Sequence, residues 1–159
     1  MPDLRRRSVV IAAGMLAGVL ATGCGATRAR RGLSHAQFIA SADAVCRYEQ
    51  AKLLYIADRT RRLGRAVTSP PVIRQQVAQS QLATSRLGAL AKPPGDAHEI
   101  ETWLTARTVA ATVAIDLAEA PARGDAIAVG DVRRELARTR ARARGLALAS
   151  GSEVCGETD

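Results

Sequence analysis

From residue 34 onward, the sequence has no stretch in which apolar and polar residues alternate as a half-buried β-strand requires. Alanine and arginine, which are both strong helix formers, dominate this part of the chain. Prolines and glycines divide it into four segments, at Gly64, at Pro93 and Pro94, and at Pro121 and Gly124. We therefore predict an all-α fold that consists of four helices.

Each predicted helix begins at a side chain that can cap its first backbone N–H groups. These four residues are Ser34, Ser69, Asp96 and Asp125. Ser34 and Asp96 are each followed three residues later by Gln or Glu, which completes a capping box. Gly130 falls within the first turns of the fourth helix, so Asp131 is an alternative start. The last ten residues, 150–159, are mostly polar and are expected to form a loop.

Each segment also carries an apolar stripe at helical spacing. In the first helix it runs through Ile39, Ala42, Cys46, Leu53, Ile56 and Leu63, and in the third through Ile100, Trp103, Leu104, Ala111 and Ala114. Short connections between long helices favour antiparallel neighbours, hence an up-down-up-down four-helix bundle. The chain has one Phe and one Trp, so an alanine-rich core buries little apolar area and would benefit from a covalent link.

The N-terminus has the features of an export signal. Three arginines precede the uncharged apolar residues 9–22, a stretch too short to span a bilayer as a mature helix. The alternative is a short buried helix. Residues 20–24 (LATGC) resemble the bacterial lipobox, although Ala21 stands where Leu is usual. The resemblance implies cleavage before Cys24 and acylation of Cys24. The alternative is ordinary signal cleavage, with Cys24 left as a thiol.

These features predict the segments of the chain and its cellular location. Residues 1–23 are expected to be the signal peptide, 24–33 a lipidated basic tether, 34–156 the bundle and 157–159 a tail. Arginines in the tether would lie beside lipid headgroups, where each basic residue contributes about 1 kcal/mol to membrane binding. The alternative is that the tether is a solvated linker. The expected location is the extracytoplasmic face of the cell membrane. Arg6 and Arg7 also loosely resemble a twin-arginine signal, so the export route stays open.

The other two cysteines, Cys46 and Cys155, are predicted to form a disulfide, because an exported chain folds in an oxidising compartment. Closing a loop of about 100 residues contributes about 4.7 kcal/mol in chain-entropy estimates. The alternatives are two buried thiols or metal ligation, but no CxxC or Cys–His pair has ligand spacing. Because Cys46 lies about three turns into the first helix, either the tail folds back along that helix or the helix extends past the bundle.

The formal charge of +8 falls to +6 once residues 1–23 are removed, which leaves 20 basic against 14 acidic residues. Four arginines of the fourth helix could contact an anionic surface: Arg133, Arg134, Arg138 and Arg142. Anionic lipid, an acidic wall polymer or another envelope protein would suit them, and a solvated face is the alternative. Export excludes nucleic acid, and the scarcity of aromatic residues also disfavours base stacking.

No residue pattern indicates catalysis. His98, Glu99 and Glu101 cluster at the start of the third helix, but the chain has no Glu-x-x-His motif of the kind found in di-iron bundles. Asp43 could pair with Arg47 one turn away. Asp116 is expected on the solvent-facing side of its helix, and the alternative is a buried carboxylate paired with an arginine. A phosphate-binding loop and a nucleophile elbow are both missing from the sequence, so we expect no cofactor, no metal and no enzymatic activity.

Four segments resemble one family: residues 38–47 (FIASADAVCR), 92–96 (KPPGD), 124–126 (GDA) and the final Cys155-Gly156. They are similar to small exported, often lipid-anchored helical proteins of high-GC Gram-positive bacteria, which have no established activity. The resemblance implies the architecture and address above and adds no catalytic residue. We expect a membrane-anchored binding or scaffold module. The alternative is an envelope carrier or sensor that holds a small apolar ligand within the bundle, which requires a cavity.

Overall fold

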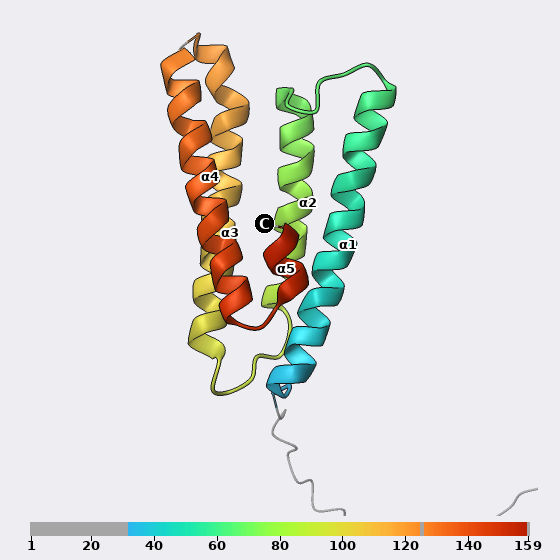
Figure 1. Ribbon diagram of the computed structural model, residues 1–159, viewed down its shortest axis with the longest axis vertical. Coiled ribbons are helices and arrows are strands. Elements are labelled where there is room, and N and C mark those ends of the chain that lie inside the picture. The colour runs from blue at the N-terminus through green and yellow to red at the C-terminus, as the bar shows by residue number, and fades with distance from the viewer. Residues whose placement is uncertain (1–31, 125, 159) are drawn as a thin grey trace, which may run out of the picture. The chain divides into compact units, whose positions relative to one another are not determined.

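The computed structural model describes residues 32–124 and 126–158 (Figure 1). Four long helices, α1 (His35–Arg62), α2 (Pro70–Gly88), α3 (Ala97–Glu119) and α4 (Ala126–Ala149), run alternately in opposite directions. A short 3-10 helix, η1 (Ala120–Arg123), follows α3, and a fifth helix, α5 (Glu153–Thr158), ends the chain. The predicted all-α, antiparallel four-helix bundle is therefore confirmed. The signal peptide and Cys24 lie outside the described residues.

A helix that could span a membrane is not found among residues 32–124 and 126–158.

The bundle has two ends. We call the end where α1 and α3 begin, and where α2 and α4 finish, the proximal end, and the opposite end the distal end.

The capping box at Ser34 is confirmed. Its hydroxyl accepts a hydrogen bond from the Gln37 backbone N–H at 3.3 Å, and the Gln37 side chain accepts one from the Ser34 N–H at 3.0 Å. After α1, Gly64 takes a φ of 66°, a left-handed conformation that glycine adopts without a steric penalty. Leu63 caps the C-terminus of α1 and is 58% exposed, so the apolar stripe predicted for this helix ends at Ile56, about two turns early.

Two other predicted caps form differently. The Asp96 side chain does not cap α3, and its carboxylate instead lies 2.6 Å from His35 Nδ1 at the start of α1. The second predicted capping box is therefore wrong, because a tertiary contact uses the Asp96 side chain. Ser69 precedes α2 without a side-chain cap bond. The last long helix, α4, begins at Ala126, which rules out the alternative start at Asp131.

The loop predicted for residues 150–159 is also wrong, because residues 153–158 form α5. The chain turns at Gly151, with a φ of 83°, and the backbone N–H of buried Ser152 donates to the carbonyl of Ala147 at 3.0 Å. These features turn α5 back along α1, as one of the two sequence alternatives expected. The predicted disulfide is confirmed: the Cα atoms of Cys46 and Cys155 are 5.2 Å apart, and their sulfurs are bonded.

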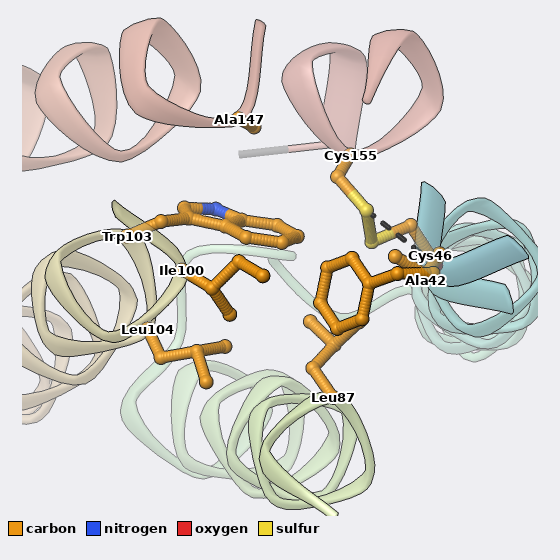
Figure 2. Close-up of a cluster of buried hydrophobic side chains, with 9 residues drawn as sticks. Ala42, Cys46, Leu87, Ile100, Trp103, Leu104, Ala147 and Cys155 are labelled. Carbon is orange, nitrogen blue, oxygen red and sulfur yellow. Dashed lines mark hydrogen bonds between the residues drawn. A yellow bond between two sulfur atoms is a disulfide. The ribbon is translucent and has the colours of Figure 1, made fainter. Parts of the chain in front are cut away.

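The proximal half of the bundle has a filled core (Figure 2). Trp103 and Ile100 of α3 face Leu87 of α2 and the disulfide between Cys46 and Cys155. Each of these five side chains is at most 2% exposed. The large side chains of the chain therefore gather near the proximal end.

Helix α5 separates α1 from α4. It packs against both of them, whereas the Cα atoms of α1 nowhere approach those of α4 within 8 Å. The disulfide joins α5 to Cys46, and Ser152, just before α5, contacts Asp43, so α5 lies along the first half of α1. The fourth side of the bundle is thus covered by α5 in the proximal half only (Figure 1).

Candidate ligand-binding cavity

A cavity of about 370 Å³ lies in the bundle beyond the filled core, on the distal side of α5. All four long helices and the α1–α2 connection line it. Its apolar wall includes Leu53 from α1, Ile73 and Val77 from α2, Leu117 from α3 and Leu136 from α4. Hereafter we call this space the distal cavity.

The amino-acid sequence of α3 accounts for the distal cavity. The side chains that α3 directs inward are large in its first turns, where Ile100 and Trp103 lie, and become methyl groups at Ala111 and Ala114. Each change from a large side chain to alanine removes volume that neighbouring helices fill only by moving closer. Because α5 separates α1 from α4, that approach is limited, and the distal half keeps an open space.

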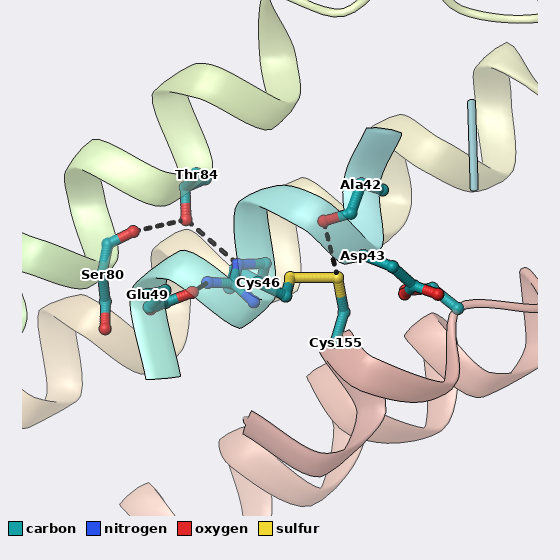
Figure 3. The surroundings of a disulfide bond; sticks show 9 residues. Ala42, Asp43, Cys46, Glu49, Ser80, Thr84 and Cys155 are labelled. Carbon is teal, nitrogen blue, oxygen red and sulfur yellow. Dashed lines mark hydrogen bonds and ion pairs between the residues drawn. A yellow bond between two sulfur atoms is a disulfide. The ribbon is translucent and has the colours of Figure 1, made fainter. Parts of the chain in front are cut away.

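A buried ion pair lies at the inner end of the distal cavity. The guanidinium Nη2 of Arg107 in α3 donates to the Glu49 carboxylate of α1 at 2.6 Å, and each side chain is only 2% exposed. Arg107 Nε donates to the Thr84 hydroxyl of α2 at 3.1 Å, and this hydroxyl donates to the carbonyl of Ser80 at 2.9 Å (Figure 3). The chain of polar contacts thus fixes the Arg107 guanidinium between three helices.

Among the described residues, the polar side chains that line the distal cavity include no carboxylate. They are Thr68, Gln76, Ser80, Thr84, Arg107 and Arg140. Arg107 is paired with Glu49 at the inner end of the cavity, and Arg140, which is exposed and also interacts within the protein, lines the cavity from α4. The cavity therefore combines a wall of aliphatic side chains with polar side chains that can donate hydrogen bonds.

The two bonded cysteines are completely buried and serve the packing of α5. The Ser152 hydroxyl donates to the Asp43 carboxylate at 2.5 Å, which fixes the start of α5 to α1. The sequence suggested that Asp43 could pair with Arg47. In the structure, the Asp43 carboxylate instead accepts the hydrogen bond from Ser152. The reason is that the returning tail places a hydroxyl beside Asp43, which α1 alone could not supply.

The arginines predicted for an anionic surface are all exposed on α4. Arg134 pairs with Asp131 and Arg138 with Glu135, each one turn away on the same helix. These ion pairs reduce the positive charge that Arg134 and Arg138 offer to a partner. Arg142 lines a groove of about 450 Å³ between α3 and α4 that also contains Glu101 and Glu135. Arg133 lies in the same exposed row, so the role predicted for these four arginines stays a prediction.

A smaller pocket of about 350 Å³ lies at the proximal end, between Phe38, Ile100 and the end of α4. His35, Asp96 and Ser150 lie on it, which are the residue types of a catalytic triad. However, the Ser150 hydroxyl donates to the carbonyl of Leu146 at 2.9 Å, and within residues 32–158 as described no hydrogen bond joins it to His35. The structure therefore gives no sign of an activated serine.

The remaining predicted polar residues lie at the surface. His98 and Asp116 are exposed, and for Asp116 this confirms the expectation. Among the described residues, no group of three or more His, Cys, Asp and Glu side chains could hold a metal ion.

The sequence contains a signal for the buried ion pair, which was not among the predicted contacts. Arg107 continues the apolar stripe of α3 between Leu104 and Ala111, and Glu49 lies between Cys46 and Leu53 on the stripe of α1. Two opposite charges, each on the apolar stripe of its own helix, indicate a buried pair, because a lone buried charge is very costly. The cavity itself had no comparable signal, because alanines at a helix interface either bring helices together or leave space.

No protein-family model, no curated protein and no solved structure matches the chain.

Proposed function

We propose that this chain is a lipoprotein anchored at the extracytoplasmic face of the cell membrane, where its helical bundle binds a small ligand in the distal cavity. The observation that supports ligand binding is the cavity of about 370 Å³, which α1, α2, α3 and α4 all line. Small-molecule sites in proteins are concave, mostly apolar and about 300–1,000 Å³ in volume.

The sequence supports the proposed location of the protein, and the disulfide agrees with it. The arginines, the apolar stretch and the lipobox-like residues 20–24 favour export and acylation of Cys24. A disulfide between Cys46 and Cys155 fits an oxidising compartment, because disulfides persist there and are rare in the cytosol. Two or three acyl chains at one cysteine would hold the protein stably on a membrane.

The size of the distal cavity limits the ligand. One non-hydrogen atom in a condensed phase occupies about 30 Å³, so the cavity holds on the order of 12 such atoms. A ligand of this size buried among aliphatic side chains is a short-chain or single-ring compound. The fixed guanidinium of Arg107 gives the inner end of the cavity a hydrogen-bond donor and prevents the cavity from being a purely apolar void.

Membrane anchoring is tested by the variant Cys24→Ala, which should move the protein from the membrane fraction to the soluble extracytoplasmic fraction. A membrane fraction that stays unchanged would refute the anchor.

Ligand binding is tested by calorimetry with decan-1-ol, a neutral amphiphile of suitable size. The variant Ala110→Trp introduces an indole into the cavity wall and should abolish binding, and Gln76→Trp does the same from α2. The matched control is Thr112→Trp, which adds the same indole to α3 at an exposed position outside the cavity lining. Circular dichroism should show that all three variants are folded. Decanol binding that survives both cavity variants would refute the proposed site.

A further inference from the structure

One outer face of the bundle, where α1 packs beside α2, carries both tyrosines of the chain. Tyr48 and Tyr55 lie seven residues apart on α1, about two helical turns, and are 45% and 54% exposed. Leu82 of α2 is 44% exposed beside them. We call this surface the tyrosine face. It consists of Tyr48, Lys52, Tyr55 and Arg59 from α1 and of Leu82 and Arg86 from α2.

Cation–π contacts join the two helices across the tyrosine face. The Lys52 Nζ atom lies 5.3 Å from the centre of the Tyr48 ring, and the guanidinium carbon of Arg86 lies 5.0 Å from it. Because α1 and α2 are antiparallel, Leu82, one turn before Arg86, lies beside the turn of α1 that follows Tyr48. Cations from both helices thus contact the Tyr48 ring and restrict its movement before any partner binds.

The cations of the tyrosine face are not balanced by carboxylates of the two helices that carry them. Helix α2 contains no Asp or Glu. Among residues 32–124 and 126–158, no ion pair involves Lys52, Arg59 or Arg86, and a cation–π contact leaves the positive charge in place. Each acidic side chain of α1 binds another part of the protein: Asp43 binds Ser152, Glu49 binds Arg107 and Asp58 binds Arg62.

The composition of the tyrosine face resembles the centre of a protein–protein interface. Tyr and Arg are enriched at such centres and provide most of the binding energy there. Anionic lipid surfaces attract basic residues alone, so an exposed leucine beside two tyrosines favours a protein partner. Two antiparallel helices form an elongated surface, on which the apolar side of an amphipathic helix can lie.

We propose that the tyrosine face is a docking site for an acidic amphipathic helix of a partner protein. Apolar side chains of that helix would pack on the two tyrosines and Leu82, and its carboxylates would pair with the three cations. The tyrosines are about 10.5 Å apart along α1, so the partner helix would repeat its apolar side chains every seven residues. The site is separate from the distal cavity, because none of its six residues lines that cavity.

The test measures the binding of three dye-labelled helical peptides to the full chain, with its disulfide intact, by fluorescence anisotropy. The first peptide, of about 18 residues or five turns, has Leu along one side and Glu beside it. The second has Lys in place of each Glu, and the third has Ala in place of each Leu. We expect the first peptide to bind at least about tenfold more tightly than the other two. Added salt should reduce its advantage over the second peptide.

Two variants assign the binding to the tyrosine face. Tyr55→Ala and Arg86→Glu should each weaken binding of the first peptide at least about tenfold, as loss of a central interface residue does. The matched controls are Val109→Ala, at a position 47% exposed on α3, and Arg74→Glu, at an exposed position of α2 outside the face, and both should bind like the unmodified chain. Circular dichroism should show that all four variants are folded.

Four outcomes would overturn the docking site. The first is failure of the first peptide to bind. The second is equal binding of the first and third peptides, which would show attraction of any anion. The third is an equal loss in Arg74→Glu and Arg86→Glu, which would show attraction by net charge. The fourth is displacement of the first peptide by vesicles of anionic phospholipid, which would assign the face to a membrane. None of these outcomes changes the expected binding of decan-1-ol in the distal cavity.

Discussion

The buried pair between Glu49 and Arg107 allows a quantitative prediction about stability. Arg107→Met keeps a long unbranched side chain but removes the cation, so the Glu49 carboxylate stays buried without its Arg107 partner, and the Thr84 hydroxyl loses a donor. Removing one partner of a buried ion pair costs about 3–5 kcal/mol. Because the stability of a domain is typically about 5–15 kcal/mol, the variant should lose a large part of its free energy of unfolding.

The loss of unfolding free energy can be expressed as a decrease in melting temperature. A folded body of about 125 residues has an unfolding entropy of about 0.26 kcal/mol/K, so each kcal/mol shifts the Tm by about 4 °C. We therefore expect Arg107→Met to melt about 11–19 °C below the unmodified protein. The matched control is Arg138→Met, which breaks the pair with Glu135. Because the Arg138 side chain is 70% exposed, that pair should contribute less than about 1 kcal/mol.

The double variant Glu49→Leu with Arg107→Met distinguishes the contribution of the two charges from the contribution of the volume that their side chains fill. Replacing both charges with apolar side chains of similar volume is often neutral or stabilising, so the double variant should recover most of the stability that Arg107→Met loses. Urea and thermal unfolding would be followed by circular dichroism on the chain carrying Cys24→Ala with its disulfide intact. The reasoning fails if Arg107→Met costs no more than Arg138→Met, or if the double variant is less stable than Arg107→Met alone.

Two further predictions concern the ends of the described chain. The double variant Cys46→Ala with Cys155→Ala should lose about 2–5 kcal/mol and expose α5 to proteolysis, since a six-residue helix is not stable alone; an unchanged urea midpoint would contradict this. Reductant should also raise the intact mass of the unmodified protein by two hydrogens. Gly32→Ala would place its Cβ 2.5 Å from the backbone carbonyl oxygen of Lys92, so we expect the free energy of unfolding to fall by about 1–3 kcal/mol. The control is Gly95→Ala, because a Cβ at Gly95 meets no atom within 4 Å. Equal urea midpoints for Gly32→Ala and Gly95→Ala would show that this close contact does not exist in solution.

The long helices and the disulfide could be predicted from the sequence because their determinants are local or compositional. Ser34 caps α1 through a residue three positions away, and Gly64 follows the last turn of the same helix. The pairing of Cys46 with Cys155 followed from assigning Cys24 to the lipid and from the oxidising compartment. Each of these inferences needs only neighbouring residues or a count of cysteines, so it does not depend on how the helices pack.

The features that the sequence did not reveal depend on tertiary contacts. Six residues are too few for a helical period to be recognised, and Gly151 and Gly156 in the same tail are typical of a loop. Residues 153–158 become helical because the disulfide at Cys155 and the bond from Ser152 to Asp43 fix them against α1. The missing cap at Asp96 has the same kind of cause, because His35 from another helix binds its carboxylate.

The position of α5 links these observations to the distal cavity. Helices that pack directly have axes about 8–10 Å apart, and a helix inserted between two others increases their separation by about one helix diameter, or about 10 Å. The disulfide at Cys155 holds α5 in this place in the proximal half, where Trp103 and Ile100 fill the remaining interior. Beyond α5, Ala111 and Ala114 leave the interior unfilled, while the buried pair of Glu49 and Arg107 joins α1 to α3 across the interior. The same covalent link that stabilises a light core therefore also keeps the bundle from closing, which makes the cavity a property of the fold and not of one side chain's rotamer.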